Sequence, residues 1–354
     1  MPASSTISHY GVVSARMSEL SSISPRVSVP KVPNDEDERN LVRVARMYFL
    51  DDKTQQEIAE TFGVSRFTVG RWLRRARESG LVRIEIVSTD SSVVEIGGRV
   101  EQALGLRQCI VVAPENGAGV DDVRRLIGEA GARCLEEMLR DGQTISVTWG
   151  RTLADMAARV RPQRRSSISV CEIMGGAAQI SEAFAAHEVA TRLAERCGGR
   201  CYFLQAPVMV TDPATRDILL ADESVSRTLD IARGSDIAVL GVGAATDNLI
   251  LVVGGFMKPS EIEAVAAAGA VANIGGWFVD KDGNEVPTAY AERTIALKVG
   301  AIRKIPTKIV VAGGPEKVVG ILAAARGGLM DILVTDTGTA ESLLRLVEAS
   351  NPPE

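Results

Sequence analysis

The 354-residue sequence predicts an α/β protein in two unequal parts: a small helical N-terminal domain and a large domain built on a doubly wound, Rossmann-like parallel sheet. Three observations support this fold class. Apolar residues recur with helical spacing from residue 39 to about residue 79. After residue 89, short apolar runs alternate with alanine-rich amphipathic stretches, which is typical of repeated strand and helix units. Four of these apolar runs end in loops of small residues.

Composition excludes several classes of protein. Hydrophobic residues make up 45% of the chain, which is enough for a packed core and excludes disorder as the main state. The formal net charge of −5 argues, as an average, against a strongly basic nucleic-acid binder. The longest uncharged run, 264–279, is shorter than the roughly 18 apolar residues of a spanning helix. We therefore expect no membrane partner and a cytoplasmic location.

The first 34 residues have neither helical nor strand periodicity and no signal-peptide pattern, and they end in prolines and an acidic cluster. We expect a disordered leader over 1–34. Domain boundaries then follow at 35–89 for the small domain and 90–350 for the large one. The five cysteines lack the paired spacing of a metal site, so we interpret them as small buried hydrophobes and expect neither a metal nor a cofactor.

The small domain has local signals for three helices and a following strand. Thr54 and Glu57 have the spacing of a capping box, which satisfies free amides at the start of a helix. Gly63 supplies a left-handed turn that other residues resist. Val82, Ile84 and Ile86 alternate with charged residues, as in a short strand or wing. The predicted helices are at 39–49, from 54 onward, and at 65–79.

This pattern is that of a helix-turn-helix, in which the second helix of the motif enters the major groove of DNA. Residues 39–87 contain ten basic and six acidic residues, so this segment carries +4 and the rest of the chain −9. A three-helix bundle without DNA contacts is the alternative, but Ser65–Arg77 holds five arginines and no acid, whereas a solvated face mixes both signs. The expected DNA-contacting residues are Thr54, Ser65, Arg66, Phe67, Thr68, Arg71, Arg74 and Arg75.

Seven strands and eight helices are predicted in the large domain. The strands are expected at 108–113, 144–148, 168–173, 200–204, 236–241, 307–312 and 331–335. The helices are expected at 120–139, 153–160, 182–196, 215–231, 259–268, 292–299, 316–326 and 340–348. A hairpin turn is expected at Asp280–Asn284.

Parallel sheets bind ligands where the carboxyl ends of their strands run into helices. Small-residue loops follow four predicted strands, at 148–152, 174–176, 241–243 and 312–317. Glycines at strand ends are often mere turn formers, but four such loops in one sheet favour an anion or polyol pocket with Arg151 and Lys317 as cations. Thr152 would cap a helix and donate its hydroxyl.

Several motifs in order resemble the SorC family of sugar-responsive bacterial transcriptional regulators, which includes deoxyribonucleoside, central glycolytic gene and LsrR-type regulators. The motifs are S-R-x-T-V-x-R-x-L-x-x-A-R at 65–77, T-W-G-R-T at 148–152 and I-G-G-W-F-V-D at 274–280. The resemblance covers residues from about 39 to 349.

The resemblance implies an effector domain related in fold to ribose-5-phosphate isomerase and glucosamine-6-phosphate deaminase. It also implies a homo-oligomer, dimer or tetramer, that binds operator DNA and a sugar, sugar phosphate or polyol. Asn273 stands where many relatives have an aspartate, so the hydroxyl pattern or charge of the effector is expected to differ. The expected effector-binding residues are Trp149, Gly150, Arg151, Thr152, Gly175, Gly176, Gly243, Asn273 and Lys317.

A sugar-phosphate isomerase or deaminase with an added DNA-binding domain is the main alternative function. Such enzymes need a positioned acid or base. The loop 241–248 contains no histidine, and His9 and His187 are expected in the leader and in the middle of a helix, away from every candidate loop. We therefore expect no catalytic residues. A ligand-independent architectural protein is a third possibility, which the glycine loops argue against.

Overall fold

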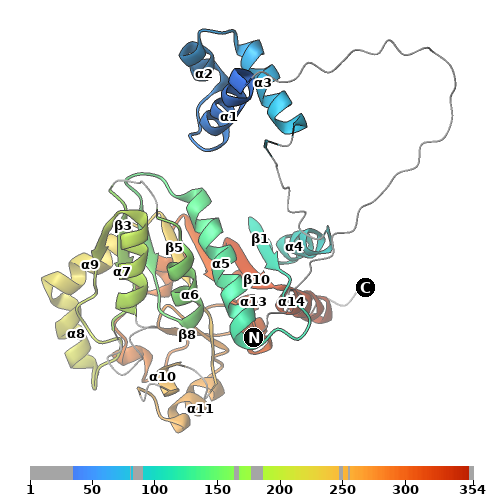
Figure 1. Cartoon of the computed structure of the whole chain (residues 1–354). Coiled ribbons are helices and arrows are strands. Elements are labelled where there is room, and N and C mark those ends of the chain that lie inside the picture. Colours follow the sequence, from blue (N-terminus) through green and yellow to red (C-terminus); the bar gives the residue numbers. More distant parts are fainter. Residues whose placement is uncertain are drawn as a thin grey trace, which may run out of the picture. The chain divides into compact units, whose positions relative to one another are not determined.

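The computed structural model describes residues 35–79, 81–82, 91–162, 167–176, 186–246, 250–253 and 256–350. The chain divides into two compact units, residues 1–87 and 88–354 (Figure 1). The expected leader and all but the first residue of the expected wing strand at 82–86 lie outside the described residues. No helix in the described ranges is both long and apolar enough to cross a membrane.

The first unit is built from α1 (Asp35–Phe49), α2 (Gln55–Phe62) and α3 (Arg66–Glu78). The helices pack around the buried side chains of Val44, Ile58, Val69 and Leu73. The capping box is confirmed, because the Thr54 hydroxyl accepts a hydrogen bond from the Glu57 amide and the Glu57 carboxylate accepts one from the Thr54 amide. Gly63 adopts the expected left-handed conformation at φ 64°.

The second unit contains a seven-stranded sheet in the order β1-β10-β9-β5-β2-β3-β4, and every neighbouring pair is parallel. All seven expected strands are present. The five inner strands are almost entirely buried, as expected for a parallel sheet covered on both faces, whereas the two edge strands are partly exposed. The strands are β1 (Gln108–Val112), β2 (Thr144–Val147), β3 (Ser169–Glu172), β4 (Arg200–Tyr202), β5 (Ile237–Leu240), β9 (Thr307–Val311) and β10 (Ile332–Asp336).

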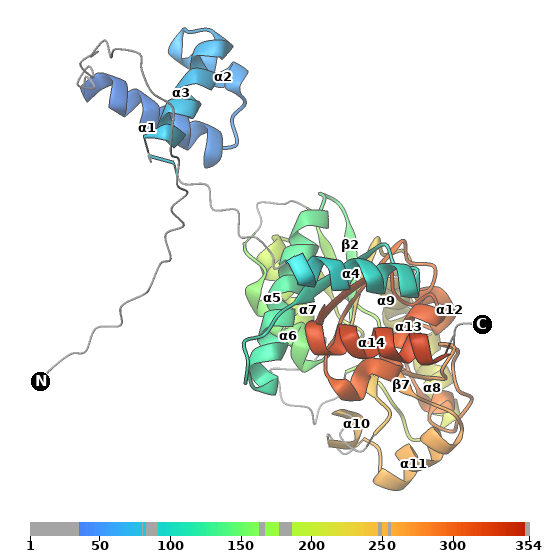
Figure 2. The ribbon, with the colours of Figure 1, turned by 90° about the vertical axis from the view of Figure 1, so that its right-hand side faces the viewer.

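Helices cover both faces of this sheet, as expected for a doubly wound fold. One face packs against α5 (Val120–Met138), α6 (Arg151–Arg159) and α7 (Ala186–Cys197), seen in green in front of the sheet in Figure 1. The other face packs against α4 (Ser91–Leu104), α9 (Glu223–Arg233), α13 (Val318–Arg326) and α14 (Thr337–Ser350). Figure 2 shows α4 and α14 lying side by side. Alternate strand residues therefore belong to two separate cores.

A second, antiparallel sheet joins β6 (Gly243–Ala244), β7 (Ala272–Ile274) and β8 (Trp277–Val279). The expected turn follows β8, where the Asp280 amide donates to the Asn284 carbonyl at 2.9 Å. Short helices α10 (Ile250–Val253) and α11 (Pro259–Ala267) lie between β6 and β7 in the chain.

The structure differs from the expected helices at several places. The helix expected at 215–231 is two helices, α8 (Pro213–Ala221) and α9, because Asp222 takes an extended conformation and caps α9 through Ser224. The prediction of a helix at 292–299 is wrong. This segment begins with a 3₁₀ turn, η2 (Ala291–Arg293), continues as extended backbone and reaches α12 (Val299–Ile302). Helix α4 was not expected. The helix expected from residue 316 begins as a 3₁₀ turn, η3 (Pro315–Lys317), before α13.

The cysteines are all free thiols. Four of them are buried and Cys201 is partly buried. Burial raises the pKa of Cys109 to about 12 and that of Cys171 to about 11, so both remain protonated thiols near neutral pH. The interpretation of these cysteines as small buried hydrophobes fits this arrangement.

Candidate functional sites

The exposed face of α3 is the basic surface expected for DNA contact. Arg66, Arg71 and Arg74 are exposed, and none of the three has an ion-pair partner among the described residues. Arg75 is exposed as well, whereas Val69, Leu73 and Ala76 point into the core. Helical periodicity thus separates an apolar inner face from an arginine-rich outer face.

The N-terminus of α3 also presents an apolar side chain to solvent. Phe67 is 91% exposed, although burial of a phenylalanine is favourable. Ser65 caps α3, accepting from the Thr68 amide at 3.2 Å, and the two hydroxyls lie 2.9 Å apart. The Thr54 hydroxyl likewise caps α2, because it accepts from the Glu57 amide and donates to the Glu57 carboxylate. These polar groups and Phe67 lie at the helix ends that a helix-turn-helix brings to DNA.

The loop after β2 begins the expected effector site. Thr148 is buried and its Oγ1 accepts from the Gly241 amide at 3.1 Å, which joins this loop to the one after β5. Gly150 has φ 138°, where a side chain would be strained, and it precedes the first turn of α6. Arg151 is exposed at that turn, while Thr152 is buried and Trp149 is packed in the core.

The loop after β9 places a lysine at the same edge of the sheet. Lys317 is partly buried, and burial lowers the pKa of its amine. The neighbouring Glu316 opposes this shift, whereas the positive charges of Arg151 and Arg124 add to it. Arg124 is paired with Asp155 at 2.6 Å, but Arg151 and Lys317 have no ion-pair partner within the described part of the chain. The charges of Arg151 and Lys317 therefore act on one another, while the carboxylates of Glu316 and Asp336 partly offset the charge of Lys317.

The base of this loop is held by β10. Asp336, the last residue of β10, accepts from the Thr339 amide at 3.0 Å and from its hydroxyl at 2.6 Å. The Thr339 hydroxyl in turn accepts from the Gly314 amide at 2.8 Å. Gly313 has no room for a side chain, because a Cβ would lie 2.3 Å from the Asp336 Oδ2.

The loop after β3 differs from the expectation that its glycine amides face an anion. The Gly175 amide donates to Ile295 and the Gly176 amide donates to Ala206, at 3.0 and 2.8 Å. Gly175 is required sterically, since a Cβ would lie 2.5 Å from the backbone of Pro207. These two glycines can therefore serve an effector by leaving space rather than by donating hydrogen bonds.

The small sheet contributes Asn273, which pairs in register with Gly243. Asn273 is buried, and its Nδ2 has no hydrogen-bond partner in the described structure. Tyr290 is also buried and lies close to Asn273 and Thr294; burial raises the pKa of its hydroxyl strongly. The Tyr290 hydroxyl also lacks a partner in the described structure, so these two neighbouring polar groups can serve one another as well as a ligand.

Sequence reasoning missed a histidine at this edge. Nδ1 of His187 lies 2.5 Å from Glu172 Oε1, at the end of β3. The expectation that His187 lies away from every candidate loop is wrong, because its imidazole Cε1 is 3.8 Å from where a Gly176 Cβ would be. His187 belongs to α7, and the first four residues of the helix expected at 182–196 lie outside the described residues. The two residues are 15 positions apart, so no local pattern links them.

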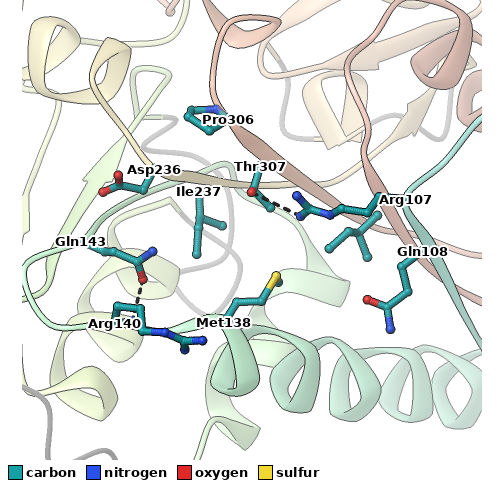
Figure 3. Close-up of a pocket in the computed structure, with 10 residues that line it drawn as sticks. Arg107, Gln108, Met138, Arg140, Gln143, Asp236, Ile237, Pro306 and Thr307 are labelled. Carbon is teal, nitrogen blue, oxygen red and sulfur yellow. Dashed lines mark hydrogen bonds between the residues drawn. The ribbon is translucent and has the colours of Figure 1, made fainter.

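A cavity of about 570 Å³ lies at the opposite, amino-terminal edge of the strands (Figure 3). Its arginines already have partners, since Arg107 donates to the Thr307 hydroxyl at 3.2 Å and Arg140 donates to backbone carbonyls at the end of α5. Because the cavity lies at the amino-terminal edge of the sheet, it is separate from the loops at the carboxyl ends of the strands. The cavity is lined by Arg107, Gln108, Met138, Arg140, Gln143, Asp236, Ile237, Pro306, Thr307 and Ile332.

Known proteins match both units of the chain. Residues 91–345 match the family model described as "Putative sugar-binding domain", and residues 46–79 match the model of sigma-70 region 4. The deoxyribonucleoside regulator of Bacillus subtilis is 28% identical over 306 residues, covering 86% of this chain and 96% of the relative. The erythritol catabolism regulatory protein EryD of Brucella abortus is 27% identical, with 88% and 98% covered.

A solved structure shows the same arrangement of elements. The full-length sorbitol operon regulator SorC from Klebsiella pneumoniae aligns with a TM-score of 0.69 and 25% identity, covering 88% of this chain and all of that one. These matches confirm the resemblance to the SorC family and the expected fold class.

Proposed function

The chain belongs to the sugar-binding domain family that its residues 91–345 match, and from that membership we propose a transcriptional regulator whose operator binding is controlled by a sugar, sugar phosphate or polyol. The observation that carries the proposal is that Arg151 and Lys317, two cations without a salt bridge in the described structure, lie close enough for their charges to act on one another beside the start of α6. A helix N-terminus with cations nearby favours a phosphate.

The DNA-binding half of the proposal rests on α3. Its exposed Arg66 and Arg71 can reach guanine edges or phosphates, while Arg74 and Arg75 suit phosphate contacts. Phe67 suits contact with a thymine methyl. Thr54, Ser65 and Thr68 suit phosphate hydrogen bonds at helix starts. The net charge of +4 in residues 39–87, against −9 elsewhere, confines attraction for DNA to this unit.

In the effector half, Gly150, Arg151, Thr152 and Lys317 hold the phosphate or a terminal hydroxyl. Asn273 hydrogen-bonds a hydroxyl of the ligand. Gly243 pairs with Asn273 in the small sheet and so fixes the position of Asn273. Trp149, Gly175 and Gly176 form the walls. The ligand changes the geometry of a dimer or tetramer, and thereby the spacing of paired recognition helices.

Fluorescence anisotropy with DNA selected from a random pool tests this proposal. We expect salt-dependent binding of the full chain, shifted by one member of a panel of sugar phosphates and polyols. The same panel should raise the melting temperature, because specific ligands stabilise the folded state. Failure of every panel member to alter either quantity would favour a ligand-independent DNA-binding protein.

The same panel separates a regulator from an enzyme. We propose that the chain binds its ligand without turning it over, although the Glu172–His187 pair provides a positioned acid–base group that sequence reasoning had not found. NMR of each sugar phosphate incubated with the full chain should show no isomerised or deaminated product. Appearance of product would identify the enzyme alternative.

A further inference from the structure

Glu172 is a fully buried carboxylate at the carboxyl end of β3. Burial raises its pKa, because the charged form loses its hydration. Both of its oxygens have partners: Oε2 accepts from the Leu204 amide at 2.8 Å, and Oε1 meets His187 Nδ1 at 2.5 Å. A carboxylate in this position is retained at a cost, which calls for a specific use.

The carboxylate fixes the orientation of the His187 ring. Which nitrogen of a histidine is free depends on the hydrogen bond that the other one makes, and here Nδ1 is committed to Glu172. The ring also packs at a tilt on Phe203, with centroids 4.8 Å apart. The His187 side chain remains 50% exposed, and its Nε2 has no partner among the described residues. Glu172 and Phe203 thus orient the imidazole, and its second nitrogen makes no contact with the described residues.

The available nitrogen lies at the edge of the sheet that carries the effector loops. Glu172 is in register with Val147, the last residue of β2, directly before the loop that holds Arg151. A Cβ at Gly176 would lie 3.8 Å from Cε1 of the ring, so the ring adjoins the glycine loop after β3. The same β3 loop adjoins the turn after Asn273, because a Cβ built on Gly276 would lie 3.3 Å from Cε of Met174.

We propose that His187 is an effector-binding residue whose Nε2 hydrogen-bonds a hydroxyl of the bound sugar or polyol, with Glu172 as its positioning residue. The inference rests on the proposed function, since it names a further contact of that same site. A hydroxyl both donates and accepts, so the contact forms with neutral imidazole and with imidazolium. The phosphate end, held by Arg151 and Lys317, does not need this contact.

NMR of the full chain labelled with ¹⁵N-histidine tests the contact directly. The sequence has two histidines, so the spectrum is simple, and His187→Asn assigns the signals. The probes are 2-deoxyribose 5-phosphate, erythritol 4-phosphate and sorbitol 6-phosphate, with inorganic phosphate as the control. We expect the Nε2 resonance to move on saturation with the sugar phosphate that binds, and to stay in place with inorganic phosphate, which lacks the carbon-bound hydroxyls.

Two variants separate binding from folding. His187→Asn keeps a donor at the position of Nδ1, so Glu172 stays paired, but it removes Nε2; we expect a 3- to 10-fold weaker affinity with little change in melting temperature, the range of one hydrogen bond. His187→Gln places its amide near the position of Nε2 and should retain more of the affinity. Glu188→Gln, one residue along α7, is the matched control and should bind as the unaltered chain does.

The outcomes distinguish this inference from the proposed function. Equal affinity of His187→Asn and the unaltered chain, or an Nε2 resonance unmoved at saturation, overturns the role of His187 while leaving a regulator with a sugar-phosphate site. Absence of binding by every probe to the unaltered chain overturns the proposed effector class and the inference with it.

Discussion

The hydroxyl of Thr148 accepts a hydrogen bond from the amide of Gly241 at 3.1 Å, which joins the loop after β2 to the loop after β5. The two strands are neighbours in the sheet, so the bond fixes two adjacent ligand loops relative to one another. Thr148 is 2% exposed, so no water competes for the acceptor.

Thr148→Val removes this acceptor and nearly preserves the side-chain shape. The Gly241 amide is then left unpaired, which costs about 1–3 kcal/mol of unfolding free energy. We expect weaker binding of the active sugar phosphate as well, because the two loops are no longer joined. Urea denaturation and calorimetry measure the two effects. Thr148→Ser, which keeps the hydroxyl, should lose less of both; equal losses would show that the methyl group, not the hydrogen bond, matters.

The lowered pKa of Lys317 predicts that effector binding depends on pH. Because burial and the nearby arginines lower its pKa, the amine loses its proton at a lower pH than an ordinary lysine. A bound phosphate favours the charged amine, so affinity should fall as pH rises through this lowered pKa, at a lower pH than for an ordinary lysine. Titrations above pH 7.5 avoid the second ionisation of phosphate, which has a pKa of about 6.

Two variants at this position check the assignment. Lys317→Arg stays charged and should bind with a flatter pH profile, whereas Lys317→Met should bind weakly at every pH. Operator binding without ligand should be unchanged in both variants. A pH profile of Lys317→Met that matches the unaltered chain would place the titrating group elsewhere.

Most of the fold was predictable because its signals are local. The five inner strands of the sheet are almost entirely buried, so they contain mostly apolar residues. The Thr54–Glu57 capping box lies within four residues. The helix expected at 292–299 failed for the opposite reason. Its backbone pairs with distant residues, as Thr294 does with Met209 and Ala296 with Met174. Such pairing overrides a helical pattern.

The same distinction applies to the candidate site. The loops around Gly150 and Lys317 were found because glycines and cations follow apolar runs in the sequence. The role of Gly175 was not evident, since its amide partner Ile295 is more than a hundred residues away. The Glu172–His187 pair was missed because it depends on how α7 packs on β3.

The DNA-binding surface predicts a separation of functions. Arg71 is exposed on α3 and without an ion-pair partner in the described structure, so Arg71→Ala should weaken operator binding by about 1–3 kcal/mol. Sugar-phosphate binding should not change. Anisotropy at several salt concentrations measures the loss. Arg133→Ala on α5, which removes the same charge from the other unit, is the control. An equal loss in both variants would indicate a general charge effect.

The close packing around Gly313 predicts that the loop of Lys317 does not tolerate a side chain at this position. A methyl group there would lie 2.3 Å from Asp336 Oδ2 and 2.4 Å from Ile127 Cδ1, closer than atoms can approach. Gly313→Ala must therefore displace Asp336, which holds Thr339 and through it the Gly314 amide. We expect a loss of about 1–3 kcal/mol in unfolding free energy, the usual cost of overpacking.

Because the displaced groups carry the loop of Lys317, the same variant should also bind the sugar phosphate more weakly. Gly300→Ala in α12 is the matched control, since no atom outside its own helix lies within 4 Å of the added Cβ. That change should leave binding intact and stabilise the chain by up to about 1 kcal/mol, because alanine restricts the unfolded chain more than glycine. If Gly313→Ala were as stable as Gly300→Ala, the Asp336–Thr339 pair would have to be mobile enough to yield, and the loop would not be the rigid anion site inferred from its hydrogen bonds.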